Sequence, residues 1–171
     1  MGAPPITDPE DRGPEYVAGP ASASQFDLAA WLNDATKLAR TQYDDAELVM
    51  MYASGVARDG KVDLTKRGHA GYMFRSPRRS APERRCYYRL DMRGSKIEVG
   101  PILPATTGDP CAWPIAPPPR CTMKKIWDEA VQLGVDPSKQ AYIRYTVKKG
   151  KPTWEFTVLG GPQEFLFGDD C

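Results

Sequence analysis

Two stretches of the chain place apolar residues at helical spacing. In the first, from residue 25 to about residue 40, they recur three and four positions apart and predict one buried helix face. Ser24, with Asp27 three positions later, indicates a capping box at the start of this helix. The same spacing runs from Met123 to Leu133, and Gly134 is the expected stop of the second helix.

Short apolar runs, several of them alternating with polar residues, predict strands between and after these helices. The runs cover residues 47–57, 62–64, 71–75, 86–92, 96–102, 141–147, 153–159 and 165–167. Glycine turns such as Asp59–Gly60 and Lys149–Gly150 separate some of them, and turns of this kind join antiparallel neighbours. The pattern therefore predicts an α+β protein in which two helices pack on an antiparallel sheet.

The two helical segments align without gaps. Residues 28–38 match residues 123–133 at the apolar positions, and a polar loop, a strand and a glycine hairpin follow each helix. This favours a duplicated α-β-β-β unit. The alternative is that any two amphipathic helices look alike, because both must obey the same apolar period.

Proline marks the boundaries between these segments. The chain has 17 prolines in 171 residues, and they are clustered; the usual share is about 5%. We expect a disordered leader over residues 1–24, a first unit over 25–104, a proline-rich connector over 105–120 and a second unit over 121–171.

Tandem helix-plus-sheet units of this size resemble the PepSY-like and β-lactamase-inhibitor-like modules of bacterial envelopes. The resemblance is architectural and covers roughly residues 25–168. No sequence motif supports it, so it transfers no site residue. It implies an extracytoplasmic, non-catalytic module that binds or inhibits.

The four cysteines are Cys86, Cys111, Cys121 and Cys171. An even number permits two disulfides in more than one connectivity. A bond between Cys111 and Cys121 would close a short proline-rich loop, and one between Cys86 and Cys171 would tie the tail to the sheet. Four reduced thiols in a cytosolic protein are the alternative.

The start of the sequence leaves two locations open. Residues 1–5 lack the basic and apolar regions of a signal peptide, and no run approaches the roughly 18 apolar residues of a membrane span. The protein is then either cytosolic, or exported with a targeting segment that the sequence does not include. The net charge of +1 gives no electrostatic case for nucleic acid.

The motifs of catalysis and of metal binding do not occur in this sequence. His69 is the single histidine and stands in a polar turn, where we expect an exposed loop residue. No Gly-x-Ser-x-Gly, phosphate-loop or Cys-x-x-Cys pattern is present. We expect no catalytic residue, no cofactor and no metal ion.

One basic loop and one tryptophan are the candidate binding residues. The loop carries five arginines within eleven residues, and charge of this kind suits an anionic partner. Its alternative role is to keep a loop between strands soluble. Trp113 lies in the connector, where it either packs onto the domain as a strap or is exposed for a partner. The arginines are Arg75, Arg78, Arg79, Arg84 and Arg85.

Two functions follow from this pattern. The first is a non-enzymatic periplasmic or secreted module that binds or inhibits another protein, or binds an anionic ligand. The second is a cytosolic structural or assembly subunit. Such a subunit would self-associate through its sheet edges, or bind an anionic partner through the basic loop.

Overall fold

A computed structural model of the chain describes residues 15–79, 86–94, 96–100 and 110–171. Over these residues the chain forms two α-helices and one eight-stranded antiparallel sheet, so the predicted α+β class is confirmed. The strands are β1 (Glu15–Ala18), β2 (Glu47–Val56), β3 (His69–Arg75), β4 (Tyr87–Arg93), β5 (Lys96–Gly100), β6 (Ala141–Lys148), β7 (Lys151–Val158) and β8 (Glu164–Gly168). The helices are α1 (Leu32–Gln42) and α2 (Met123–Gln132), with 3-10 turns η2 (Ala23–Gln25) and η3 (Pro110–Ala112).

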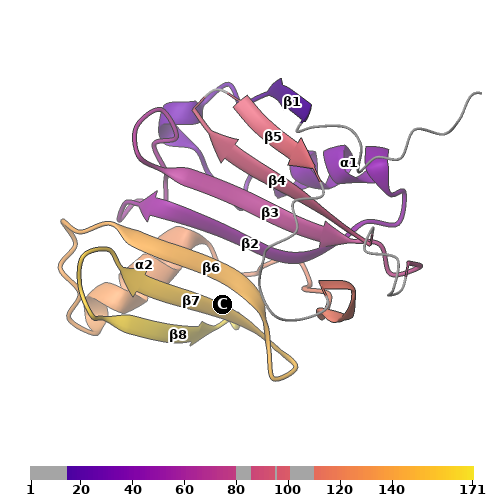
Figure 1. Ribbon diagram of the computed structural model, residues 1–171. Coiled ribbons are helices and arrows are strands. Elements are labelled where there is room, and N and C mark those ends of the chain that lie inside the picture. The colour runs from indigo at the N-terminus through magenta and orange to yellow at the C-terminus, as the bar shows by residue number, and fades with distance from the viewer. Residues whose placement is uncertain (1–14, 80–85, 95, 101–109) are drawn as a thin grey trace, which may run out of the picture.

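The sheet is built outward from its middle. Its strand order is β1-β5-β4-β3-β2-β6-β7-β8 (Figure 1). The central strands β2 and β6 are antiparallel neighbours, and each is the first strand after a helix. The strands that follow β2 extend the sheet on one side, and those that follow β6 extend it on the other. The strands that follow each helix therefore belong to one continuous sheet.

Both helices pack on the same face of this sheet, behind it in the view of Figure 1. The main core lies between them and the sheet, and its largest fully buried side chains include Trp127 and Trp154. The Trp127 ring meets the Phe156 ring edge-on with centroids 4.8 Å apart, and its indole N–H donates to the Val56 carbonyl at 3.2 Å. The buried contact between these two rings holds α2 against β7, and the indole hydrogen bond holds it against β2.

Helix α2 has the ends that its sequence predicts. The Thr122 side chain accepts a hydrogen bond from the backbone N–H of Lys125 at 3.2 Å, which caps the first turn. Gly134 follows the helix with φ +95°, a conformation that glycine adopts without steric cost.

Helix α1 begins later than its apolar pattern suggests. Phe26 exchanges backbone hydrogen bonds of 2.9 and 3.0 Å with Val62, and this bridge keeps it extended. Asp27 then caps a separate turn by accepting a backbone N–H bond at 3.0 Å, and the helix starts only at Leu32. The predicted capping box at Ser24 is therefore wrong, because a contact distant in sequence overrides the local signal.

Two further predictions need correction. The leader is not disordered over its last part, since Glu15 in β1 pairs with Val99 in β5 and η2 follows; residues 1–14 lie outside the described residues. The return strand expected at 62–64 is reduced to a bridge at Val62, which pairs with both Phe26 and Val56.

Neither cysteine pairing suggested by spacing is present. Cys86 lies at bonding distance from Cys111, with Cα atoms 5.5 Å apart, and Cys121 from Cys171, with Cα atoms 5.2 Å apart. Cys111 packs beside Tyr87 in a small cluster separate from the helices, whereas Cys121 belongs to the main core. The two faces of the sheet separate them, so the bond between Cys111 and Cys121 is wrong.

Candidate binding face

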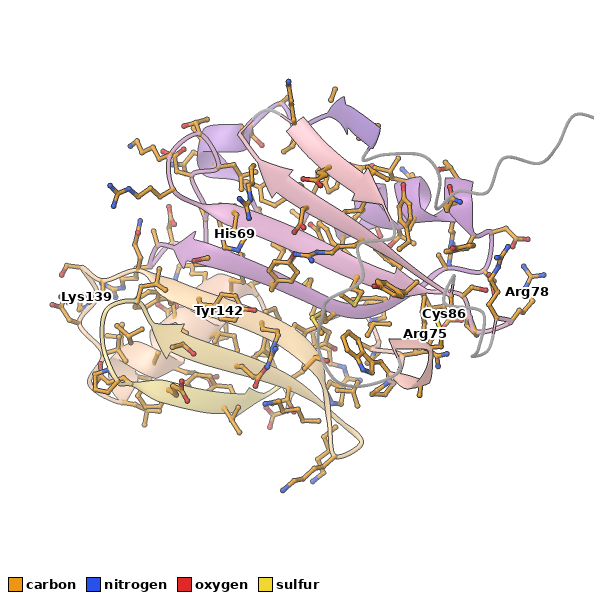
Figure 2. The ribbon with its side chains drawn as sticks, viewed as in Figure 1. His69, Arg75, Arg78, Cys86, Lys139 and Tyr142 are labelled. Atoms are coloured by element: carbon orange, nitrogen blue, oxygen red, sulfur yellow. A yellow bond between two sulfur atoms is a disulfide. The ribbon has the colours of Figure 1, made fainter. Side chains whose placement is uncertain are left out.

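The face of the sheet that no described helix covers carries the candidate site. Alternation along the strands sends Tyr52 to this face and Ala53 to the core. Tyr52 stands opposite Gly71 on one side and Arg144 on the other, and Arg144 stands opposite Glu155. Figure 2 is a view onto this face, here called the uncovered face.

Trp113 and the first disulfide cover one end of the uncovered face. A small buried cluster there holds Cys86, Cys111 and Tyr87, and Trp113 packs against it half-buried. Farther along the same segment, the backbone N–H of Ala116 donates to the Leu48 carbonyl at 2.7 Å. The segment is therefore a strap held to the sheet, with Trp113 packed under it, and binding of a partner by Trp113 stays a prediction.

Tyr52 is the centre of a hydrogen-bonded cluster on the uncovered face. Its hydroxyl donates to the carboxylate of Asp91 and accepts from Nη2 of Arg89 at 2.9 Å. Arg89 and Asp91 also form an ion pair at 2.8 Å. Burial, followed by the hydrogen bond to Asp91, raises the pKa of Tyr52 well above its usual value. The phenol therefore stays protonated and acts as a fixed donor.

Gly71 makes room for this cluster. A Cβ atom built on Gly71 would lie 2.4 Å from the Tyr52 hydroxyl oxygen and 2.8 Å from the Leu90 carbonyl oxygen. The Tyr52 ring therefore lies across the backbone of β3 at a position that tolerates no side chain.

A second ionic cluster lies on β6 and β7. The Glu155 carboxylate accepts hydrogen bonds from both Arg144 and Lys148. Burial raises the pKa of Glu155, but the two cations outweigh it and hold the pKa below its usual value. Beside them the Tyr142 ring lies 6.5 Å from the Tyr52 ring, and a hollow of about 510 Å³ opens between Tyr142 and β8.

In both clusters the carboxylate is covered more than its cations. The Glu155 side chain is 14% exposed, against 36% for Arg144 and 41% for Lys148. Asp91 is 12% exposed and Arg89 25%. The uncovered face therefore presents guanidinium and ammonium groups beside the half-buried ring of Tyr142, whereas the acids and Tyr52 are more covered.

His69 is not the exposed loop residue that we expected. It is the first residue of β3, half-buried, with its ring 6.1 Å from that of Tyr52. Burial, together with the charge of Arg93, lowers the pKa of His69. The imidazole is therefore neutral near pH 7 and adds polarity without charge.

The described arginines of the basic loop have partners within the chain. Arg78 forms ion pairs with Asp44 and Asp45, and the Arg79 guanidinium lies 4.6 Å from the centre of the Tyr43 ring.

Arg75 is the last residue of β3, just before this loop, and lies near Cys86 in Figure 2. It donates from Nη1 to the Cys111 carbonyl at 2.8 Å. Arg84 and Arg85 lie outside the described residues. These contacts give the arginines a structural role, and anion binding by the loop stays a prediction.

Sequence reasoning did not identify the uncovered face as the site. Its residues belong to strands that were predicted, but their partners lie in other strands, and only the strand order brings them together. The one available signal was a set of charged residues alternating with apolar ones inside strands, where charge is unusual. The residues missed in this way are Tyr52, Arg89, Asp91, Tyr142, Arg144 and Glu155.

Comparison with protein-family models, with curated proteins and with solved structures finds no match for this chain. The function must therefore be argued from the uncovered face itself. The described residues include no cluster of three or more His, Cys, Asp or Glu side chains able to hold a metal ion. Nor is any helix in the described part of the chain long and apolar enough to cross a membrane.

Proposed function

We propose that this chain is a non-catalytic binding module that recognises an acidic surface of a partner protein through its uncovered face. The observation that carries the proposal is that the cationic side chains of both ionic clusters are more exposed than the carboxylates. In both ionic clusters the carboxylates lie deeper than the cations, so a partner meets the arginines Arg89 and Arg144 together with Lys148. Tyrosine and arginine are also the side chains that most often dominate binding energies at protein interfaces.

The rigidity of the face supports this role. The guanidinium of Arg89 is held by Tyr52 and Asp91, and that of Arg144 by Glu155, so neither side chain must be ordered when a partner binds. Binding to preorganised groups avoids part of the entropic cost of association. A planar guanidinium held in place also has donors free for a partner carboxylate.

We also propose an extracytoplasmic location and a duplicated origin. Two cysteine pairs at bonding distance favour an oxidising compartment. A helix precedes each central strand, and each half extends the sheet outward, which supports duplication of an α-β-β-β unit. The resemblance to PepSY-like modules remains a proposal that rests on this architecture.

Affinity capture with charge-reversed protein tests the proposed function. Wild-type protein, Arg144→Glu and Lys37→Glu are immobilised separately. Lys37→Glu is the control, because it reverses the charge of a side chain on α1 that is 80% exposed. We expect one protein to be retained by wild type and Lys37→Glu, released by raised salt, and lost with Arg144→Glu. Equal retention by all three forms would contradict binding through the uncovered face.

A further inference from the structure

Strand β8 ends the sheet, and its outer edge is unpaired within the part of the chain that the structure describes. Its described neighbour is β7 alone. The five residues of β8 include no lysine or proline, and its register with β7 has no bulge. Lysine, proline and bulges are features by which proteins usually protect an edge strand from pairing. Leu166 is instead 66% exposed, more than Leu133 and Leu159, the other exposed leucines among the described residues.

The backbone direction of β8 follows from its turn. Val158 donates a hydrogen bond to the Gln163 carbonyl at 3.0 Å, so this opposed pair is a hydrogen-bonded one. Bonded and non-bonded positions alternate along an antiparallel pair, so Phe165 and Phe167 direct their backbone groups toward β7. The residues that direct N–H and C=O groups outward are Glu164, Leu166 and Gly168.

The strand after the turn is held in place and needs no ordering before it pairs. Cys171 is bonded to Cys121, and Asp169 accepts backbone hydrogen bonds of 2.9 to 3.0 Å from Arg120 and Cys121. On the core side, the Phe165 and Phe167 rings stack with centroids 6.0 Å apart. The edge is therefore a preformed template for another strand.

Charge around the edge suits an antiparallel copy of the same strand. A hollow of about 700 Å³ beside Gly168 is lined by Lys148, Lys149 and Lys151. Lys148 is paired with Glu155, whereas Lys149 and Lys151 form no ion pair with a described residue. Asp169 and Asp170 line the hollow too. The three lysines of the lining outnumber these two carboxylates, and Asp169 also accepts hydrogen bonds from the backbone.

We propose that two copies of this chain associate by antiparallel pairing of their β8 edges about a twofold axis at Leu166. In this register Leu166 pairs with Leu166 of the second copy, and Glu164 pairs with Gly168. Each Glu164 carboxylate then enters the lysine-lined hollow of the other copy. Each Phe165 meets the second copy's Phe167. The contact is isologous, so every interaction away from the axis occurs twice.

Sedimentation velocity over a range of protein concentrations tests the association. We expect a concentration-dependent dimer, and we expect Leu166→Lys to raise its dissociation constant by at least about tenfold, because a lysine at the axis repels its own copy. Leu133→Lys is the matched control, since Leu133 is 59% exposed but lies at the end of α2. A monomer at all concentrations, or equal effects of the two variants, overturns the proposal.

Two further variants test the register. Hydrogen-bonded antiparallel pairs have Cα atoms about 5.5 Å apart, so Leu166→Cys should form a disulfide with its own copy, whereas Leu133→Cys should not. Peptide mapping must show the native pairs intact in both variants. Glu164→Lys alone should weaken the dimer, and adding Lys151→Glu to the same chain should restore it. If the Leu166→Cys variant forms a dimer but no disulfide between the two copies, the interface lies elsewhere and the β8 pairing is overturned.

Discussion

The indole N–H of Trp154 donates a hydrogen bond of 2.9 Å to the carboxylate of Asp169, which lies in the tail after β8. The same carboxylate accepts from the backbone of Arg120 and Cys121. It also lies 3.4 Å from the Tyr145 hydroxyl. One side chain therefore joins the end of the strap, the core of the second unit and the tail.

Replacing Asp169 by alanine should destabilise the protein by about 3 kcal/mol, because buried donors would lose a charged acceptor. Asp169→Asn keeps one acceptor oxygen and should cost less, about 1 kcal/mol. Urea unfolding monitored by tryptophan fluorescence measures both. The neighbouring Asp170→Ala is the control, and we expect a change within about 0.5 kcal/mol. Equal effects at the two positions would contradict the anchoring role of Asp169.

Gly71→Ala should disrupt the Tyr52 cluster and cost about 2 kcal/mol, because the added methyl group overlaps the Tyr52 hydroxyl and the backbone of β4. Gly161→Ala is the matched control, since its Cβ would meet Val158 at an ordinary 3.7 Å. Thermal unfolding by circular dichroism compares them. If the two variants melt together, the Tyr52 ring does not lie over Gly71.

Peptide mapping without reduction should find Cys86 joined to Cys111 and Cys121 joined to Cys171. Replacing both Cys121 and Cys171 by alanine should cost about 2–4 kcal/mol, since the bond closes a loop over a separation of 50 residues. Alkylation before and after reduction of natively isolated protein gives the thiol count. Four free thiols would contradict the proposed extracytoplasmic location.

The stability of the turn before β2 should depend on pH through Asp45. Burial raises the pKa of Asp45, but hydrogen bonds from Ser76 and Arg78 outweigh it and lower the pKa from 3.8 to about 2. A carboxyl whose pKa is lower in the folded state adds stability above its unfolded pKa. That stability is lost as the pH falls from about 4 to about 2. After allowance for solvent screening we expect about 1 kcal/mol.

Carboxyl NMR titration checks the pKa of Asp45, and urea unfolding at several acidic pH values checks the loss of stability. Ser76→Ala removes the hydroxyl that donates to Asp45 at 2.8 Å, and it should raise the pKa of Asp45 toward 3.8. An Asp45 pKa that stays near 3.8 in the wild-type protein would contradict these contacts.

Local signals in the sequence predicted local structure well. Helix α2 was predicted over the right residues because its apolar spacing and the stop at Gly134 are local signals. The hairpin at Lys149–Gly150 was predicted for the same reason, and β6 and β7 pair across it. Helix α1 was predicted with the wrong start because Val62, far along the chain, holds Phe26 extended.

The disulfide pairing and the Tyr52 cluster could not be predicted locally. They depend on the order of the strands and on which face of the sheet each segment lies. Cysteine spacing cannot show that Cys111 lies on the uncovered face while Cys121 lies in the main core. The Tyr52 cluster needs β3 beside β2 and β4 beside β3, a placement that no local pattern encodes. Arg78, by contrast, was noticed as a charge, but its pairing with Asp44 and Asp45 was not predicted.

Photo-crosslinking from Tyr142 tests most directly whether the uncovered face binds a partner. A photoreactive phenylalanine analogue replaces Tyr142 in one sample and Leu133, on the helix side, in another. Binding through the uncovered face predicts an adduct with one partner protein from position 142 alone. Unlabelled wild-type protein should compete away this adduct, whereas unlabelled Arg144→Glu should not. Adducts formed equally from both positions, or from position 133 alone, would contradict it.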